Sequence, residues 1–196
     1  VLSGPYNTGT IIGSSEVGGV AGAITMDSAA MGLLNQLYNR GDVTAQHTVG
    51  GIAGSSSGRN SFLSAAYSTG VITATSSIGK SSGAVGRLFH GTIMSVYALE
   101  GTADQMYELG LNASYSVRKV EFQSEAWLKS DEFMAALGAD AEGFAQDAEN
   151  VNDGYPLLAF QMEESLQEAK EAAIEEVNSY KDPADYKGLS KTAIED

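Results

Sequence analysis

The sequence contains no cysteine, only three prolines and only two histidines among its 196 residues. The absence of cysteine excludes a disulfide framework and catalysis by a thiol. No apolar run approaches eighteen residues, so we do not expect the chain to cross a membrane as a helix. With two histidines, a histidine-rich metal centre and a serine–histidine hydrolase each have very few possible arrangements.

Net charge is also missing from the first hundred residues, which hold four acidic and four basic side chains. The remainder carries 21 acidic and seven basic residues, and this excess accounts for the whole net charge of −14. Only four of the 23 glycines follow residue 120. This shift in composition predicts a boundary near residue 120. A negative field without a basic patch to offset it argues against nucleic acid as a partner.

Repetition at a period of about thirty residues dominates the first half of the chain. Each unit begins with a tyrosine that is followed three or four residues later by a glycine. These tyrosines are Tyr6, Tyr38, Tyr67 and Tyr97, separated by 32, 29 and 30 residues. A fixed period of this length predicts a stacked array, because one short unit cannot cover its own apolar face.

A glycine-rich phrase runs in step with the tyrosines. It reads Val17–Gly22 in the first unit, Val49–Gly54 in the second and, in altered form, Ser82–Gly86 in the third. In the third unit Ile78–Ser81 displaces the phrase by three residues, so we expect an irregular corner there. We interpret the paired glycines of these phrases as positions where one backbone passes so close to another that a Cβ atom would collide.

Short runs rich in β-branched residues predict three strands in each unit. One strand follows the tyrosine phrase, one contains the glycine phrase and one leads into the next tyrosine. The first kind is Thr10–Ile12, Asp42–Ala45 and Val71–Ala74, and the last kind is Leu33–Leu37, Ser61–Ala66 and Gly91–Val96. We therefore predict a mainly β fold, namely a parallel β-solenoid with three-strand rungs of about thirty residues, stacked about 4.8 Å apart.

In such a stack the four tyrosines lie above one another. We interpret this column as an aromatic ladder, in which each ring-on-ring contact is worth roughly 0.5–1.5 kcal/mol beyond area burial. The alternative is a platform on which sugar rings stack. We favour the ladder, because it explains the aromatic stripe by packing alone and needs no ligand.

The Val-Gly-Gly-Val-Ala-Gly and Val-Gly-Gly-Ile-Ala-Gly phrases alternate with Tyr-Asn-Thr-Gly-Thr-Ile and Tyr-Asn-Arg-Gly-Asp-Val. This alternation resembles the GLUG-motif repeats of bacterial surface proteins, which also accompany secreted peptidases that cut immunoglobulin A. The resemblance spans about residues 4 to 102. It implies an extracellular solenoid at the bacterial cell surface or cell wall, and it supplies no catalytic residues.

We predict a solenoid at residues 1–120, followed by a C-terminal cap of the solenoid at residues 121–161. Ser124–Leu128 and Ser130–Gly138 read as two short helices, each with a serine at its N-cap. Asn152–Pro156 is a turn phrase, and Leu157–Gln161 reads as a final strand. Similar Gly-Tyr-Pro endings terminate relatives with GLUG repeats. We expect the apolar helix face to lie on the open end of the solenoid, where it would prevent a rung from pairing with another chain.

The last segment, residues 162–196, predicts the start of a helical surface-protein module. Met162–Lys181 has apolar residues at three- and four-residue steps, which is typical of an amphipathic helix. Asp182-Pro183 breaks this pattern and can begin a second helix. The chain begins at Val1 within a repeat phrase and without an initiator methionine, so we expect it to be a segment of a longer protein.

Few residues suggest chemistry. His47 and His90 lie 43 residues apart without a metal-binding phrase, and we interpret them as ordinary exposed histidines. Parallel β-helices can carry polysaccharide-cleaving sites built from paired acids. The acids of the repeats are spread over different phases of the unit, and they are Glu16, Asp27, Asp42 and Glu100. Asn150–Gly154 has oxygen donors but is too short for a complete calcium loop. We therefore predict no catalytic, cofactor-binding or metal-binding residues and no cofactor.

These features favour a non-catalytic repeat module of a large bacterial cell-surface or secreted protein, acting as a spacer, as an adhesive surface or as both. Its partners would be host or microbial glycans or extracellular proteins, with no nucleic acid. The alternative, from another class, is a carbohydrate-active β-helix enzyme or an accessory domain of a secreted peptidase. The acidity of the chain favours a monomer.

Overall fold

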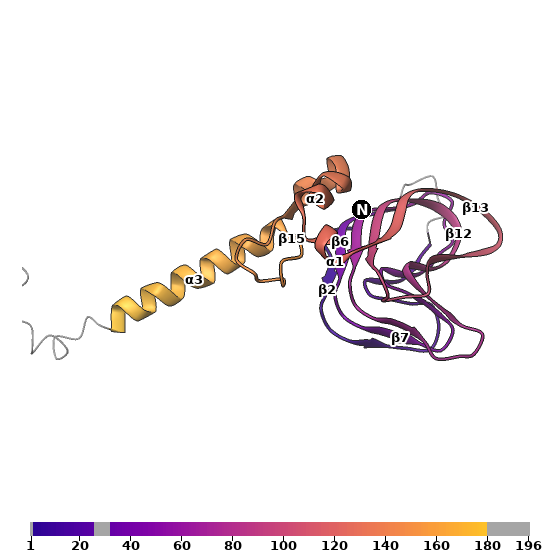
Figure 1. Ribbon diagram of the computed structural model, residues 1–196, viewed down its shortest axis with the longest axis horizontal. Helices are drawn as coiled ribbons and strands as arrows, with labels where there is room; N and C mark the ends of the chain where they lie inside the picture. Colours follow the sequence, from indigo (N-terminus) through magenta and orange to yellow (C-terminus); the bar gives the residue numbers. More distant parts are fainter. Residues whose placement is uncertain (1, 26–31, 180–196) are drawn as a thin grey trace, which may run out of the picture. The chain divides into compact units, whose positions relative to one another are not determined.

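The chain is mainly β, and its parallel sheets wind into a solenoid of about three turns. The computed structural model describes residues 2–25 and 32–179, and its coils lie one upon another (Figure 1). The chain divides into two compact units, Val1–Leu158 and Ala159–Asp196. The predicted β-solenoid is therefore confirmed, and it belongs to the first unit.

The strands follow one another in the same order in every coil. The first coil contains β1 (Leu2–Ser3), β2 (Tyr6–Asn7), β3 (Ile11–Ile12), β4 (Val17–Gly18) and β5 (Ala21–Ile24). The second contains β6 (Gly32–Asn39), β7 (Val43–Ala45), β8 (Thr48–Gly50) and β9 (Ala53–Ser56). The third begins with β10 (Ser61–Ser68) and β11 (Ile72–Ala74), and the long strands β12 (Lys80–Leu99) and β13 (Gln105–Gln123) complete the array. The glycine phrase thus contributes two short strands, β8 and β9, on either side of Gly51 and Ile52.

Coils pair in parallel with equivalent residues opposite one another. Tyr6 pairs with Tyr38, Tyr38 with Tyr67 and Tyr67 with Tyr97, as the thirty-residue period predicts. On another face, β3, β7 and β11 form a separate three-stranded sheet. Within both sheets the pairing between coils is parallel, because each coil passes through the two sheets in the same order.

The corner of the third coil absorbs a three-residue insertion. Ser81 pairs with Val49 and Ser82 with Gly50, so the glycine phrase remains in register with the phrase of the preceding coil. Five residues separate β11 from β12, whereas two separate β7 from β8. The extra residues form a turn in which the Gly79 N–H donates to the Ser76 carbonyl at 3.0 Å. The displacement seen in the sequence is therefore confined to this corner.

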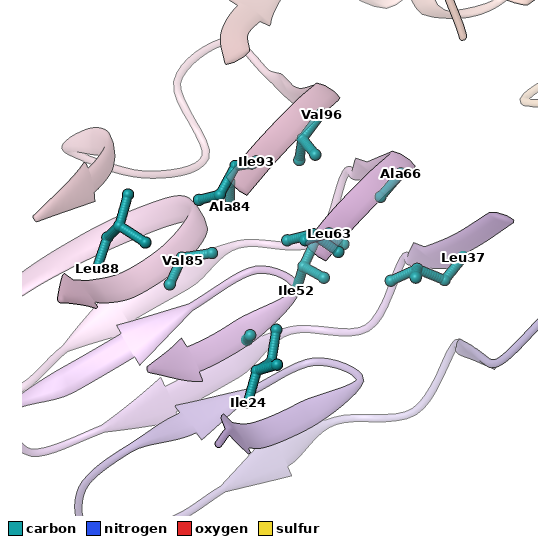
Figure 2. Packing of buried hydrophobic residues seen from close by; sticks show 11 residues of the cluster. Ile24, Leu37, Ile52, Leu63, Ala66, Ala84, Val85, Leu88, Ile93 and Val96 are labelled. Atoms are coloured by element: carbon teal, nitrogen blue, oxygen red, sulfur yellow. The ribbon is translucent and has the colours of Figure 1, made fainter. Parts of the chain in front are cut away.

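Alternating side chains divide the long strands between two cores. Leu37, Ala66 and Val96 point into the solenoid, and Figure 2 shows them on successive strands beside the other buried aliphatic side chains. The next residue in each strand is a tyrosine, and it belongs to a different buried cluster outside the coil. This alternation follows from the two-residue period of a β-strand.

One position in each coil holds a left-handed backbone, and after the first coil the residue there is not glycine. The residues and their φ angles are Gln36 (55°), Ala65 (47°), Ser95 (53°) and Lys119 (51°). The pairing of β6, β10, β12 and β13 skips this position, while the residues on both sides of it pair normally. In the first coil Gly4 holds φ at 78°, directly after Ser3, which pairs with Asn35. Equivalent positions in successive coils therefore share the same backbone kink as well as similar side chains.

The solenoid continues beyond the recognisable repeats. β13 carries neither the tyrosine phrase nor the glycine phrase, yet it pairs with β12 from Ser82–Gln105 to Leu99–Gln123. It ends at Gln123, close to the predicted boundary at residue 120. Within the described residues β12 is its only strand partner.

The short helices of residues 121–161 form as predicted, but they do not close the end of the solenoid. These elements are α1 (Glu125–Leu128), α2 (Asp131–Leu137), the 3-10 helix η1 (Gly138–Gly143), β14 (Phe144–Ala145) and β15 (Leu157–Leu158). Their apolar side chains join the tyrosine cluster on the flank of the coils. The expected position on the open end is therefore wrong. An amphipathic face shows that a helix buries one side, and here that side packs on the flank tyrosines.

The predicted N-caps and helix stop are confirmed. The Trp127 N–H donates to Ser124 Oγ, the Phe133 N–H donates to Ser130 Oγ, and Gly138 ends α2 with φ at 80°. The predicted final strand is too long, because only Leu157 and Leu158 are extended. Helix α3 (Ala159–Ser179) begins there, three residues before the predicted start at Met162. The second helix predicted after Asp182-Pro183 lies outside the described residues.

The close approach of coils at the glycine phrase can be tested at Gly50. A Cβ there would lie 2.1 Å from the Ala53 carbonyl oxygen and 2.5 Å from the Gly86 nitrogen, both of which are backbone atoms. Gly50→Ala should lower the free energy of unfolding by about 3 kcal/mol or more, because fixed backbone cannot move aside. At Gly9 the nearest atom would be 3.7 Å away, so Gly9→Ala should change stability by less than about 0.5 kcal/mol. Urea unfolding measures both, and similar losses would contradict the stacked geometry.

The repeated kink can be tested at Lys119, whose side chain is exposed. Lys119→Gly should raise the free energy of unfolding by up to about 1 kcal/mol, because glycine adopts a left-handed φ without the steric cost of a Cβ. The matched control is Arg118→Gly on the preceding residue, which should lose about 0.5–1 kcal/mol as glycine does within a strand. Thermal or urea unfolding compares the two. A larger loss for the Lys119 variant would show that the kink carries no strain.

Candidate functional site

The outer flank of the solenoid carries the tyrosine column that the sequence singled out. The rings of Tyr6 and Tyr38 stack with centroids 5.3 Å apart, and those of Tyr38 and Tyr67 stack at 5.1 Å. Tyr38, Tyr67 and Tyr97 are almost completely buried, whereas Tyr6 is 44% exposed. The ladder interpretation is confirmed for these two steps. Three of the four rings cannot act as a sugar platform, because other side chains already cover them.

Phe133 from α2 completes the aromatic flank. Its ring meets both Tyr67 and Tyr97 edge-on, with centroid distances of 5.5 Å in each case. Trp127 from α1 adds a tilted contact to Tyr97 at 5.1 Å. Edge-to-face pairs of this kind are each worth roughly 0.5–1.5 kcal/mol beyond area burial. The helices therefore attach to the coils through the tyrosine rings themselves.

A buried amide fixes the turn phrase against the same column. Asn152 Nδ2 donates to Tyr67 Oη at 3.0 Å and to the carbonyls of Tyr155 and Pro156 at 3.1 Å each. The Tyr67 hydroxyl in turn donates to the Pro156 carbonyl. The Asn152 side chain also accepts from Arg40 Nη1 at 2.8 Å. These bonds satisfy polar groups that would otherwise be buried without partners.

Charged side chains close the outside of this turn. Arg40 lies 5.0 Å from the centre of the Tyr155 ring and forms an ion pair with Asp153, while Lys129 Nζ lies 4.6 Å from the same ring centre. The Arg40 guanidinium lowers the pKa of the Asp153 carboxyl. Cations over an aromatic face gain about 0.5–1 kcal/mol at exposed sites. These contacts hold the Asn152–Pro156 turn in place. Both Arg40 and Lys129 already have partners in the turn.

The oxygen donors near Asn150–Gly154 serve the turn itself. Both carboxylate oxygens of Asp147 accept backbone N–H bonds, from Val151 and Asn152 at 2.7 Å and from Gly154 at 2.8 Å. An Asx-type loop of this kind holds its shape by internal hydrogen bonds. The segment considered as a partial calcium loop is therefore a self-supporting turn. Within residues 2–25 and 32–179, no three His, Asp or Glu side chains gather as a metal site would need.

The described acids of the repeats lie in the loops between strands. Glu16 precedes β4, Asp42 precedes β7 and Glu100 follows β12, while Asp27 lies outside the described residues. Asp42 Oδ1 accepts the Val71 N–H at 2.8 Å, which ties one coil to the next. Asp42 and Glu100 both follow a tyrosine strand, but their strands β6 and β12 do not pair directly, because β10 lies between them.

The sequence missed one acid with a clear structural role, Asp104. Its carboxylate accepts both the Ser81 N–H and the Ser81 hydroxyl at 3.0 Å. These hydrogen bonds lower the pKa of Asp104. No repeat phrase surrounds this residue, so its partner becomes visible only when β13 stacks on β12.

The two histidines do not meet. His47 is exposed at the corner between β7 and β8, and His90 lies within β12 opposite Ser114. The Ser56 hydroxyl donates to the carbonyl of His90 at 2.9 Å. The interpretation of His47 as an exposed residue is confirmed, whereas His90 is half-buried. The two histidines therefore do not form a shared site.

One surface depression of the first unit combines apolar atoms with cations that form no ion pair among the described residues. It has a volume of about 480 Å³, and we call it the α2 cleft. Its lining comes from β12, β13 and the end of α2, and consists of Met94, Ser95, Arg118, Lys119, Ala136, Leu137 and Gly138. The sequence did not single out this place, because the two cations come from β13, which has no repeat phrase, and the facing wall comes from a helix that the repeats do not predict.

Comparisons of this chain with protein-family models, with curated proteins and with solved structures found no match. None of the helices in the described residues combines the length and the apolarity that crossing a bilayer requires. The site must therefore be judged from its own geometry.

The Tyr67 hydroxyl supports a prediction on stability at high pH. Burial, and next the neighbouring Tyr38, raise the pKa of Tyr67 well above 10.0. The folded state thus holds this proton more tightly than the unfolded state does, so stability is intact below pH 10 and falls as pH rises towards the folded pKa. Tyr67→Phe should be less stable by about 1–2 kcal/mol at pH 7, because its hydroxyl bonds are lost. Its stability should also fall less steeply above pH 10.

Urea unfolding between pH 7 and pH 11 measures both effects. Tyr115→Phe, on an exposed tyrosine of β13, is the control and should leave the stability at pH 7 unchanged. Some decline above pH 10 should persist in the Tyr67 variant, since burial also raises the pKa of Tyr97 and Tyr155. An identical slope in the Tyr67 variant and the unaltered protein would contradict the assignment of this proton.

Proposed function

We propose that this chain is a non-catalytic repeat module of a large bacterial cell-surface or secreted protein. It serves as a spacer and presents an adhesive surface for glycans or extracellular proteins. The observation that carries the proposal is the residue-for-residue stacking of coils, in which Tyr6, Tyr38, Tyr67 and Tyr97 pair in sequence. A stack of this kind lengthens by about 4.8 Å with each coil and keeps its faces regular.

The roles of the polar residues support this function. Asp42, Asp104 and Asp147 accept backbone N–H bonds that hold coils and turns together. Asn7 Nδ2 donates to Asn39 Oδ1 at 2.8 Å, which links two coils on the flank. Side chains that would be candidates for chemistry are thus engaged in maintaining the stack. The resemblance of the repeat phrases to GLUG motifs agrees with a module of an extracellular surface protein.

The alternative of a carbohydrate-cleaving β-helix has less support. Such an enzyme places two carboxylates within about 5–10 Å on either side of a glycosidic bond. Glu16 lies at a different corner from Asp42 and Glu100, and the coil that contains β10 separates the coils of Asp42 and Glu100. We therefore keep the role of spacer and adhesive surface as the proposed function.

The proposal predicts binding without turnover. The purified protein should bind particular glycans on an array, or extracellular matrix proteins, with micromolar affinity, as a multi-contact surface module does. Incubation with the bound glycans, followed by chromatography of the products, should show no cleavage. Release of shorter oligosaccharides by the purified protein would overturn the non-catalytic function, and binding of no glycan or protein would leave spacing alone.

A further inference from the structure

The α2 cleft pairs two cations with an apolar lining in an otherwise acidic protein. Arg118 and Lys119 are adjacent and exposed on β13. In the described residues the ion pairs join Arg40 to Asp153, Arg87 to Glu108 and Lys129 to Glu125, and neither Arg118 nor Lys119 takes part. None of the lining residues is acidic. With a net charge of −14 for the whole chain, a carboxylate-free cleft with two cations marks a place for an anion.

The other walls limit what kind of anion fits. Met94, which is 38% exposed, gives the cleft an apolar part that a bare inorganic anion would leave uncovered. The C-terminal turn of α2 supplies Ala136, Leu137 and Gly138. A helix leaves carbonyl oxygens without intrahelical partners at this end, and its dipole is negative there. That wall favours a ligand with hydroxyl donors and disfavours a second charge.

The cleft also has a fixed frame. The Tyr97 hydroxyl donates to the Ala136 carbonyl at 3.4 Å, which ties the end of α2 to β12. Glu121 stands beside Tyr97, where its charge adds to burial in raising the pKa of that phenol, and it is not part of the lining. Ser95 holds the left-handed kink and is nearly buried. The walls are therefore set by the fold before any ligand arrives.

We propose that the α2 cleft binds a hexuronate residue of an acidic polysaccharide. The carboxylate of the sugar meets Arg118 and Lys119, its C–H face covers the exposed side chain of Met94, and its hydroxyls donate towards the end of α2. A volume of about 480 Å³ accommodates a ligand of this size, within the usual range of small-ligand sites. This inference rests on the proposed function as an adhesive module and names its ligand class.

The test compares one double variant with one matched control. Arg118→Gln/Lys119→Gln removes both charges from the cleft, and Arg59→Gln removes one charge from the exposed corner between β9 and β10. Calorimetric titration with oligogalacturonate should show binding to the unaltered protein. The double variant should bind more than about tenfold more weakly, because charge-assisted hydrogen bonds are lost. The control should bind within about twofold of the unaltered protein.

Further probes separate the sources of negative charge. A neutral galactose oligomer tests the need for the carboxylate, a poly-glutamate peptide tests an acidic protein, and sulfate tests a simple anion. Chemical shifts in the NMR spectrum should move at Lys119 and Gly138 on addition of oligogalacturonate. Circular dichroism and thermal unfolding confirm that both variants remain folded.

Each outcome decides between distinct conclusions. Unchanged oligogalacturonate affinity in the double variant overturns the cleft while the adhesive function stands. Equal or tighter binding of poly-glutamate or sulfate overturns the sugar as the ligand. An equal loss in the Arg59 control shows a general charge effect and also overturns the cleft. Binding of other glycans or proteins without oligogalacturonate removes this inference alone, whereas binding of none removes the adhesive function as well.

Discussion

The stacking of each coil on the preceding coil by backbone hydrogen bonds is the constraint on which this structure depends. Because equivalent residues pair, a residue placed once every thirty positions becomes a continuous column. Tyr38 lies between Tyr6 and Tyr67, and Gly50 lies between Gly18 and Ser82. Even the left-handed kink at Gln36, which costs free energy in any single coil, recurs in the coils that follow. A residue type or backbone conformation that suits one coil is thereby repeated in the neighbouring coils.

The tyrosine column has a consequence outside the solenoid. Inward residues such as Leu37 are covered by the opposite wall of the coil, but outward rings such as Tyr67 need another cover. Helix α2 provides it through Phe133, and the turn at Asn152 provides hydrogen-bond partners for the Tyr67 hydroxyl. The helices after the repeats are therefore part of the solenoid's structure. They attach to its flank because the apolar rings are there.

The sequence predicts most of the solenoid because its signals are periodic. The tyrosine and glycine phrases define the register directly, and Ser124 and Ser130 define the starts of α1 and α2. The stacking of β13 could not be predicted in the same way, since Gln105–Gln123 contains neither phrase. Its inward residues Val117 and Val120 pack on the core only because β12 supplies the edge on which the strand forms.

The candidate site was harder to predict than the fold, for a related reason. Asn152 and Tyr67 are 85 residues apart, and no spacing rule joins a turn residue to one ring of a repeat. An apolar helix face likewise shows that the helix buries one side without showing against which surface. The α2 cleft combines both difficulties, because Arg118 and Leu137 come from elements that the repeats do not describe.

The last strand shows how the array can end without a cover. An open strand edge invites pairing with another chain, and charged residues, bulges and irregular twists are the usual protection. β13 has charged residues and a bulge, together with left-handed kinks. The pairing passes from Leu88–Leu109 to His90–Ser114 and leaves a bulge that includes Asn112 with φ at 56°. Arg118 and Lys119 then place two charges and a second left-handed kink near the end of the strand. The two charges and the kink protect this edge of the solenoid from pairing with another chain. The same two charges line the α2 cleft, so one pair of residues can both protect the edge and bind a ligand.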